Sequence, residues 1–141
     1  MKKYKIGYTT GVFDLFHIGH LNIIRRAKEQ CDYLIVGVST DEFVKSYKNK
    51  TPVIPYEERA EIVRSLKYVD EVVAQDDMDK SKKWDELHFN AVFHGDDWKN
   101  TSVYEEIEKK LEALGVEMVY LPHTDGISTT ELLEKIHEKE K

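Results

Sequence analysis

The sequence is poor in cysteine and in long apolar runs, and each shortage excludes a class of protein. Cys31 is the single cysteine, so no disulfide can form within the chain, and a reducing compartment is the simplest location. No apolar run approaches the length needed to cross a bilayer, and no unbroken apolar core follows Met1-Lys2-Lys3 as it would in a signal peptide. We therefore expect a cytoplasmic protein without membrane insertion.

Positive charge is also in short supply. Lys and Arg number 21 against 27 Asp and Glu, which gives a formal net charge of -6. Sequence-independent binding to nucleic acid depends on many Lys and Arg side chains, so we expect no nucleic-acid partner. Hydrophobic residues make up 40% and charged residues 34% of the 141 positions. This composition is typical of one soluble globular domain, which we assign to residues 1–141.

Apolar runs alternate with amphipathic segments along the whole chain. The apolar runs predict strands at Tyr4–Thr9, Tyr33–Val38, Val69–Ala74, Ala91–His94 and Val116–Leu121. The intervening segments predict helices at Gly19–Gln30, Tyr56–Lys67, Trp84–Phe89 and Val103–Leu114, a short helix that ends near Tyr47, and a closing helix from Ser128 onward. Gly115 is expected to end its helix. The alternation indicates an α/β fold, a single Rossmann-like doubly wound domain with a five-stranded, mostly parallel sheet.

The most informative stretch is Gly11–His20, which reads Gly-Val-Phe-Asp-Leu-Phe-His-Ile-Gly-His. It follows the first predicted strand, and the spacing of His17 and His20 places both imidazoles on one face of a helix's first turn. That turn offers free backbone N–H groups and the positive end of the helix dipole, and Gly19 lets a phosphate approach the backbone. We interpret the stretch as a device that holds and reacts a nucleotide triphosphate.

Two other interpretations of this histidine pair are weaker. Zinc-binding helices more often space their histidines four residues apart, and the chain has only one cysteine to offer as a further ligand. We therefore expect no protein-bound metal site at these histidines. A buried structural pair is disfavoured because a glycine-containing turn between strand and helix usually exposes its residues at the top of a sheet.

Polar residues also follow other predicted strands, where ligands bind in sheets of this kind. Lys48 and Lys50 lie in a proline-containing loop, where they could contact phosphates or be ordinary surface lysines. The carboxylates of Gly95-Asp96-Asp97-Trp98 could bind nucleotide hydroxyls, Mg²⁺ or the histidines, or form a structural turn. Gly126–Thr130 brings three hydroxyls into a helix, of which one serves as an N-cap. The three together suggest a second phosphate site.

Arg59 shares the inward face of the predicted helix Tyr56–Lys67 with Ile62 and Val63. An arginine on such a face needs an anionic partner. A carboxylate of the same chain and a ligand phosphate are equally good candidates at this point.

Taken together, these segments resemble the nucleotidyltransferase superfamily marked by an HxGH motif, and within it the glycerol-3-phosphate cytidylyltransferase group. The resemblance covers nearly the whole chain. The segments that carry it are Gly11–His20, Asp32–Phe43, Tyr56–Arg59, Tyr68–Val73, Gly95–Trp98 and Thr124–Thr130. The HxGH motif alone is shared with adenylyltransferases, whereas its combination with Gly-Ile-Ser-Thr-Thr is much more specific for cytidylyltransferases.

The resemblance implies transfer of CMP from CTP to a phosphorylated alcohol, with glycerol 3-phosphate as the best candidate. It also implies Mg²⁺ bound with CTP, and a homodimer. The residues it implies for catalysis are His17, His20 and Lys48. Those it implies for nucleotide binding, besides the two histidines, are Val12, Phe13, Gly19, Lys50, Asp97, His123, Thr124, Gly126, Ile127, Ser128, Thr129 and Thr130. Those it implies for acceptor binding are Asp14, Lys48, Arg59 and Lys80.

Three positions depart from the group's pattern. Val12 stands where the glycerol-phosphate enzymes usually have threonine, His123 where the family has an arginine, and Lys67 where an arginine is expected. Choline phosphate, ethanolamine phosphate and sugar-alcohol phosphates therefore stay open as acceptors. An ATP-using adenylyltransferase is a further alternative, although Leu15 replaces the proline common in those enzymes. A non-catalytic nucleotide-binding domain is the alternative from another class.

Overall fold

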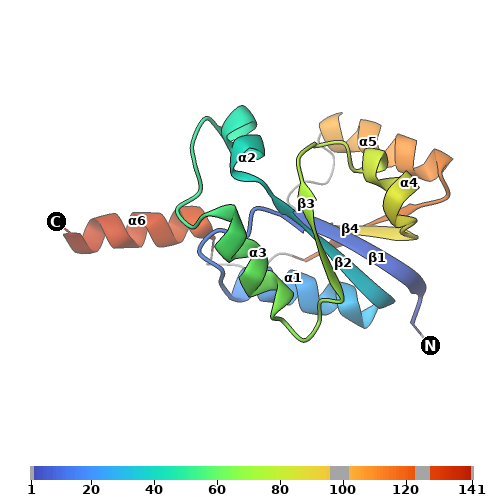
Figure 1. The fold of residues 1–141 in the computed structure, drawn as a ribbon, viewed down its shortest axis with the longest axis horizontal. Coiled ribbons are helices and arrows are strands. Elements are labelled where there is room, and N and C mark those ends of the chain that lie inside the picture. Colours follow the sequence, from blue (N-terminus) through green and yellow to red (C-terminus); the bar gives the residue numbers. More distant parts are fainter. Residues whose placement is uncertain (1, 96–101, 123–127, 141) are drawn as a thin grey trace.

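The computed structural model describes residues 2–95, 102–122 and 128–140, in which the chain forms a five-stranded sheet with helices on both faces (Figure 1). The strands are β1 (Tyr4–Gly11), β2 (Cys31–Ser39), β3 (Glu71–Gln75), β4 (Ala91–Gly95) and β5 (Glu117–Leu121). The helices are α1 (Ile18–Glu29), α2 (Asp41–Lys48), α3 (Tyr56–Arg64), the 3₁₀ helix η1 (Lys80–Lys83), α4 (Trp84–Leu87), α5 (Ser102–Ala113) and α6 (Thr129–Glu140).

The strand order of this sheet is β3-β2-β1-β4-β5, and its pairings are parallel. The chain therefore builds outward from β1 to β3 and then returns to the other side of β1 to add β4 and β5. The predicted α/β class and parallel sheet are confirmed. Ligands of such sheets bind beyond the carboxyl ends of the strands, where the strand order switches, which here is between β1 and β4. The Thr9 hydroxyl donates to the Phe93 carbonyl across this boundary at 2.9 Å.

Each face of the sheet has its own apolar core, as expected for strands covered on both sides. Ile24 of α1 and Val63 of α3 pack on one face, with Val36 of β2 between them. Tyr104 and Leu111 of α5 pack on the other face. In Figure 1, α1 and α3 accordingly lie on one side of the strands, and α4 and α5 lie on the other. The two cores fix the carboxyl ends of the strands that position the site.

Some element boundaries differ from the predictions. The helix predicted to reach Lys67 ends at Arg64, because the Leu66 N–H donates to the carbonyl of Val63, three residues back, and the i→i−4 pattern of the helix stops there. The strand predicted from Val69 starts at Glu71, because the Asp70 carboxylate is used to accept the Leu34 N–H at 2.8 Å.

The expected helix end at Gly115 is confirmed. Its φ of +79° is the left-handed conformation that glycine adopts without strain, and its N–H donates to the Glu112 carbonyl. The Val116 N–H donates to the Leu111 carbonyl, which completes the capping motif. None of the helices in the described ranges is both long and apolar enough to span a bilayer.

Candidate active site

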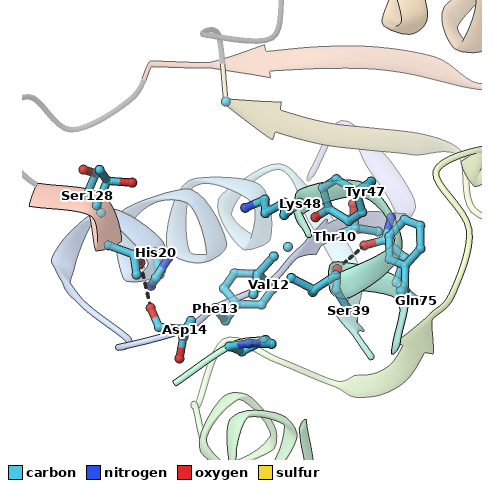
Figure 2. Close-up of a pocket in the computed structure, with 18 of the residues that line it drawn as sticks. Thr10, Val12, Phe13, Asp14, His20, Ser39, Tyr47, Lys48, Gln75 and Ser128 are labelled. Carbon is cyan, nitrogen blue, oxygen red and sulfur yellow. Dashed lines mark hydrogen bonds between the residues drawn. The ribbon is translucent and has the colours of Figure 1, made fainter. Parts of the chain in front are cut away.

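A cavity of about 720 Å³ lies beyond the carboxyl ends of the strands, at the switch in strand order. This volume is in the range of small-molecule sites. Figure 2 shows that the cavity has two ends. His20 and Ser128 lie at one end, Ser39 and Gln75 lie at the other, and the Lys48 ammonium points into the space between them.

The two histidines build the N-terminus of α1 in a way that spacing alone did not predict. His17 is not in the first turn but is the N-cap residue, with an extended backbone at φ -140°. Its Nδ1 accepts the Gly19 N–H at 3.0 Å, while Nδ1 of His20 accepts the His17 N–H at 3.2 Å. The pair is thus a reciprocal capping box made of imidazoles. Their rings stack with centroids 3.9 Å apart.

This capping arrangement decides what the histidines can offer a ligand. Because both Nδ1 atoms accept, each neutral ring carries its proton on Nε2 and can donate only from there. Nε2 of His17 is buried and has no hydrogen-bond partner among the described residues. Burial lowers the pKa of His17, and burial together with the neighbouring His17 lowers the pKa of His20 to about 3. At neutral pH the pair is therefore two uncharged N–H donors at a helix N-terminus, a site suited to phosphate oxygens.

The turn before the histidines is strained and is held by a carboxylate. Phe13 and Leu15 adopt positive φ values of 55° and 49°, which are uncommon for residues other than glycine. The Asp14 carboxylate between them accepts the backbone N–H groups of Leu15, Val53 and Ile54 at 2.8–3.1 Å. Asp14 therefore fastens the 49–55 loop to the motif, and strain of this kind often marks a functional site.

Arg59 finds its partners inside the protein. The residue is only 1% exposed, and its side chain donates to Asp41 at 2.6 Å and to the carbonyls of Val12, Ser39 and Ile54 at 2.6–2.8 Å. The sequence left two candidate partners for Arg59, a carboxylate of the same chain and a ligand phosphate. The structure shows the carboxylate, that of Asp41. Arg59 does not line the cavity. Arg59 holds the ends of β1 and β2 together through these carbonyls, and its contact with an acceptor stays a prediction.

Lys48 and Lys50 both line the cavity. Burial, and after it the charge of Lys50, lowers the pKa of Lys48, whereas the charge of Asp14 acts in the opposite direction. Two ammonium groups brought this close destabilise each other unless an anion lies near them. Their placement favours the phosphate-binding interpretation over that of ordinary surface lysines.

Lys80 lies behind the cavity wall and not on it. Its side chain is 2% exposed, and Nζ donates to the Tyr104 hydroxyl at 3.4 Å. Tyr104 does line the cavity, as does His94, whose Nε2 is 3.1 Å from the same hydroxyl. Neither His94 nor Tyr104 is predicted from the sequence to be a functional residue. His94 had a usable signal, since it ends a predicted strand, but Tyr104 looked like one more apolar position of a helix.

The hydroxyls of the Gly126–Thr130 segment reach the same cavity as the histidines. Ser128, Thr129 and Thr130 all line it. Ser128 is the N-cap of α6, since its Oγ accepts the Glu131 N–H at 3.1 Å, and the Thr129 hydroxyl donates to the Asp14 carbonyl at 2.7 Å. Two helix N-termini therefore face one space. The predicted residues Asp97, His123, Thr124, Gly126 and Ile127 lie outside the described residues.

The cavity is also lined by Val12, Phe13, Asp14 and Gly19.

The parallel sheet with this strand order, the neutral imidazole pair and the lysines define an α/β nucleotide-binding protein with an HxGH motif. The chain belongs to the cytidylyltransferase-like family, whose family model matches residues 8–135.

Relatives with assigned activities are similar over most of this chain. Glycerol-3-phosphate cytidylyltransferase of Bacillus subtilis is 42% identical over 137 residues, which cover 91% of this chain and 94% of the relative. Ethanolamine-phosphate cytidylyltransferase of Dictyostelium discoideum is 38% identical over 94% of this chain, but over only 38% of its own length. FAD synthase of Pyrococcus horikoshii is 36% identical over 91% of this chain and 89% of the relative.

Among solved structures, the lipopolysaccharide core biosynthesis protein of Thermoplasma volcanium superposes with a TM-score of 0.75 at 27% identity. The alignment covers 86% of this chain and 99% of that protein. The family suggested by the sequence motifs is thus confirmed.

Proposed function

We propose that this protein is a cytidylyltransferase that transfers CMP from CTP to a phosphorylated alcohol, with glycerol 3-phosphate as the best candidate. The observation that carries the proposal is the neutral imidazole pair, capped through both Nδ1 atoms so that Nε2 is the donor of each ring. The identity of 42% to the B. subtilis glycerol-3-phosphate enzyme, over nearly the full length of both chains, supports the choice of substrates.

In the proposed reaction, an oxygen of the acceptor's phosphate attacks the α-phosphorus of CTP. The new O–P bond forms as the bond from the α-phosphorus to the bridging oxygen breaks, and pyrophosphate leaves. No bond to the protein is needed, so catalysis comes from positioning and from electrostatic stabilisation. His17 and His20 donate from Nε2 to the triphosphate oxygens as negative charge develops on them. Lys48, between the two ends of the cavity, lowers the repulsion between the two anionic substrates.

Mg²⁺ belongs to this proposal as the ion that accompanies CTP. Among the described residues there is no group of three or more His, Cys, Asp or Glu side chains that could hold a metal ion. Mg²⁺ prefers oxygen ligands and keeps several waters, so phosphate oxygens of CTP would supply its main contacts. Bound there, it would neutralise charge on the leaving pyrophosphate.

A homodimer is part of the same proposal, and light scattering should give twice the chain mass of 16.5 kDa.

The deciding experiment incubates the protein with CTP and Mg²⁺ against a panel of phosphorylated alcohols. The panel contains glycerol 3-phosphate, a sugar-alcohol phosphate, ethanolamine phosphate and choline phosphate. We expect pyrophosphate release with glycerol 3-phosphate and a product with the mass of CDP-glycerol, and no release when EDTA is added. Binding of CTP without turnover on any acceptor would support the non-catalytic nucleotide-binding domain instead.

An adenylyltransferase is the second candidate, because a FAD synthase is 36% identical to this chain over 91% of its length. FAD is FMN joined to AMP, so an enzyme that makes FAD from FMN takes the AMP from ATP. The same assay therefore needs an arm with ATP and FMN. Pyrophosphate release in that arm and not with CTP would replace the first candidate by the second.

A further inference from the structure

The ammonium of Lys80 is buried in unusual surroundings. It donates to the Tyr104 hydroxyl and lies 4.7 Å from the centre of the Tyr104 ring. No carboxylate among the described residues forms an ion pair with it, since the adjacent Asp79 carboxylate binds Ser81 and Lys110. Burial lowers the pKa of Lys80 to about 8, while the charge of Asp79 acts in the opposite direction. A buried cation without a carboxylate at hydrogen-bond distance is unfavourable, which indicates a functional role for it.

Lys80, Tyr104 and His94 form one polar unit from three separate elements. An ammonium can only donate hydrogen bonds, so the Tyr104 oxygen accepts from Lys80. The same hydroxyl lies 3.1 Å from Nε2 of His94. Tyr104 and His94 line the cavity, whereas Lys80 does not. The positive charge of Lys80 therefore lies directly behind the wall that these two side chains present to a ligand.

This unit lies away from the end that suits the triphosphate. Tyr104 belongs to α5 and packs in the second core. Helix α5 lies on the face of the sheet opposite α1, the helix whose N-terminus carries the two histidines (Figure 1). Gln75 lies at the end of the cavity opposite His20 and Ser128 (Figure 2), and its side-chain amide donates to the Asp77 carbonyl at 3.3 Å. Met78, two residues before Lys80, lines the cavity and packs against the same core as Tyr104. The two helix N-termini occupy the first end. The second end is left for the other substrate, which also carries a phosphate.

We propose that Tyr104 and His94 are positioning residues that hold the Lys80 ammonium at the acceptor end of the cavity, and that this end selects acceptors with a neutral polyol over acceptors with an ammonium group. The proposal rests on the cytidylyl transfer proposed above. A buried charge is weakly screened, so it attracts the acceptor's phosphate and repels a second cation. The polar side chains of Ser39, Gln75 and Thr10 line the cavity as well and can bond to hydroxyls.

The test measures KM for each substrate separately. Tyr104→Phe keeps the aromatic ring and removes the hydroxyl. We expect KM for glycerol 3-phosphate to rise about tenfold, as for loss of one hydrogen bond to a charged group, while KM for CTP changes less than about twofold. His94→Leu should give the same split, and His94→Gln, which keeps a polar partner for the hydroxyl, should restore much of the acceptor affinity.

Selectivity is tested by removing the charge. We expect Lys80→Gln to reduce the preference for glycerol 3-phosphate over ethanolamine phosphate, measured as the ratio of their kcat/KM values, by about tenfold or more. Lys82→Gln is the matched control, because Lys82 belongs to the same short helix but is exposed and pairs with Asp77. The control should keep the wild-type ratio.

The outcomes separate this proposal from the one on which it rests. If the wild-type protein turns over no phosphorylated alcohol, the proposed function fails. If the wild type is active but Tyr104→Phe raises both KM values equally, or changes neither, the positioning role is wrong. If Lys80→Gln leaves the ratio of kcat/KM for glycerol 3-phosphate and ethanolamine phosphate unchanged, the proposed role of Lys80 in acceptor selectivity is wrong. Thermal unfolding and CTP binding by calorimetry check that each variant is folded, and the His94 variants test the same positioning role should Tyr104→Phe not fold.

Discussion

The imidazole of His17 stacks on that of His20 with 3.9 Å between ring centroids, and each ring caps a backbone N–H of the same turn through Nδ1. One contact network thus serves both structure and chemistry. It satisfies N–H groups that the first turn of α1 would otherwise leave unpaired, and it fixes the tautomer that leaves Nε2 as the donor. Structural and catalytic roles of the pair can therefore be separated by the choice of substitution.

Substitution of His17 by asparagine should separate the structural role of this residue from its catalytic role. Asn is a good N-cap residue and can accept the Gly19 N–H, but it has no donor where Nε2 of His17 lies. We expect His17→Asn and His17→Ala both to lower kcat by about 10²–10³. Only His17→Ala should also lose about 1 kcal/mol of unfolding free energy in urea titrations. Wild-type kcat in His17→Asn would mean that the ring serves only as a cap.

The lowered histidine pKa values predict that the protein loses stability in mild acid. His20 has a pKa of about 3 in the folded protein, and an unfolded histidine titrates near about 6.5, so the unfolded state binds more protons between these values. Stability from this group is fully present above the unfolded pKa and falls as the pH drops below it. Between pH 7 and pH 5 the loss should be about 2 kcal/mol for a histidine of this kind.

Urea unfolding at the two pH values measures this loss. His20→Gln should reduce the pH dependence by about 2 kcal/mol over the same interval. His137→Gln, which removes an exposed histidine of α6, is the control and should leave the pH dependence unchanged. Equal pH dependence in the wild type and in His20→Gln would contradict the prediction.

Lysine at position 59 should destabilise the protein while keeping the charge. The planar guanidinium reaches Asp41 and the backbone carbonyls at the ends of β1 and β2, and a lysine cannot match this geometry. We expect Arg59→Lys to cost about 3 kcal/mol of unfolding free energy, because buried acceptors lose their partners. Arg64→Lys changes an exposed pair with Glu61 on the same helix and should cost less than about 0.5 kcal/mol. Similar costs for both variants would contradict the assignment of Arg59 as a buried clamp.

Loss of the Lys48 charge should affect both substrates together. Its ammonium lies between the two ends of the cavity, so it acts on both phosphorylated molecules (Figure 2). We expect Lys48→Gln to lower kcat/KM for CTP and for the acceptor, each by about 100-fold. Lys45→Gln, an exposed position on the same helix, should stay within about twofold of the wild type. An effect of Lys48→Gln on one substrate alone would place the lysine at one end.

Features that depend on local sequence were predictable. The apolar runs predicted the five strands, and the glycine at position 115 predicted the end of α5. Because the carboxyl ends of parallel strands share one edge, the segments Gly11–His20 and Gly126–Thr130 could also be assigned to one site.

Features that depend on distances between separate segments were not predictable. The choice between Asp41 and a ligand as partner of Arg59 depends on where the fold places the start of α2 relative to the side chain of Arg59. The burial of Lys80 behind Tyr104 joins η1 to α5, and no periodicity in either segment reports that contact. Even the histidine spacing was ambiguous, since a capping residue and a first-turn residue differ by one backbone conformation.

The hydrogen bond from Thr129 to the Asp14 carbonyl joins positions 115 residues apart. During synthesis, Asp14 and the two histidines leave the ribosome long before Thr129, whose hydroxyl bonds to the Asp14 carbonyl. In a growing chain, the Gly11–His20 segment therefore lacks this hydrogen bond until the start of α6 has emerged. Full assembly of the site therefore waits until Thr129 has been made, 115 residues after Asp14.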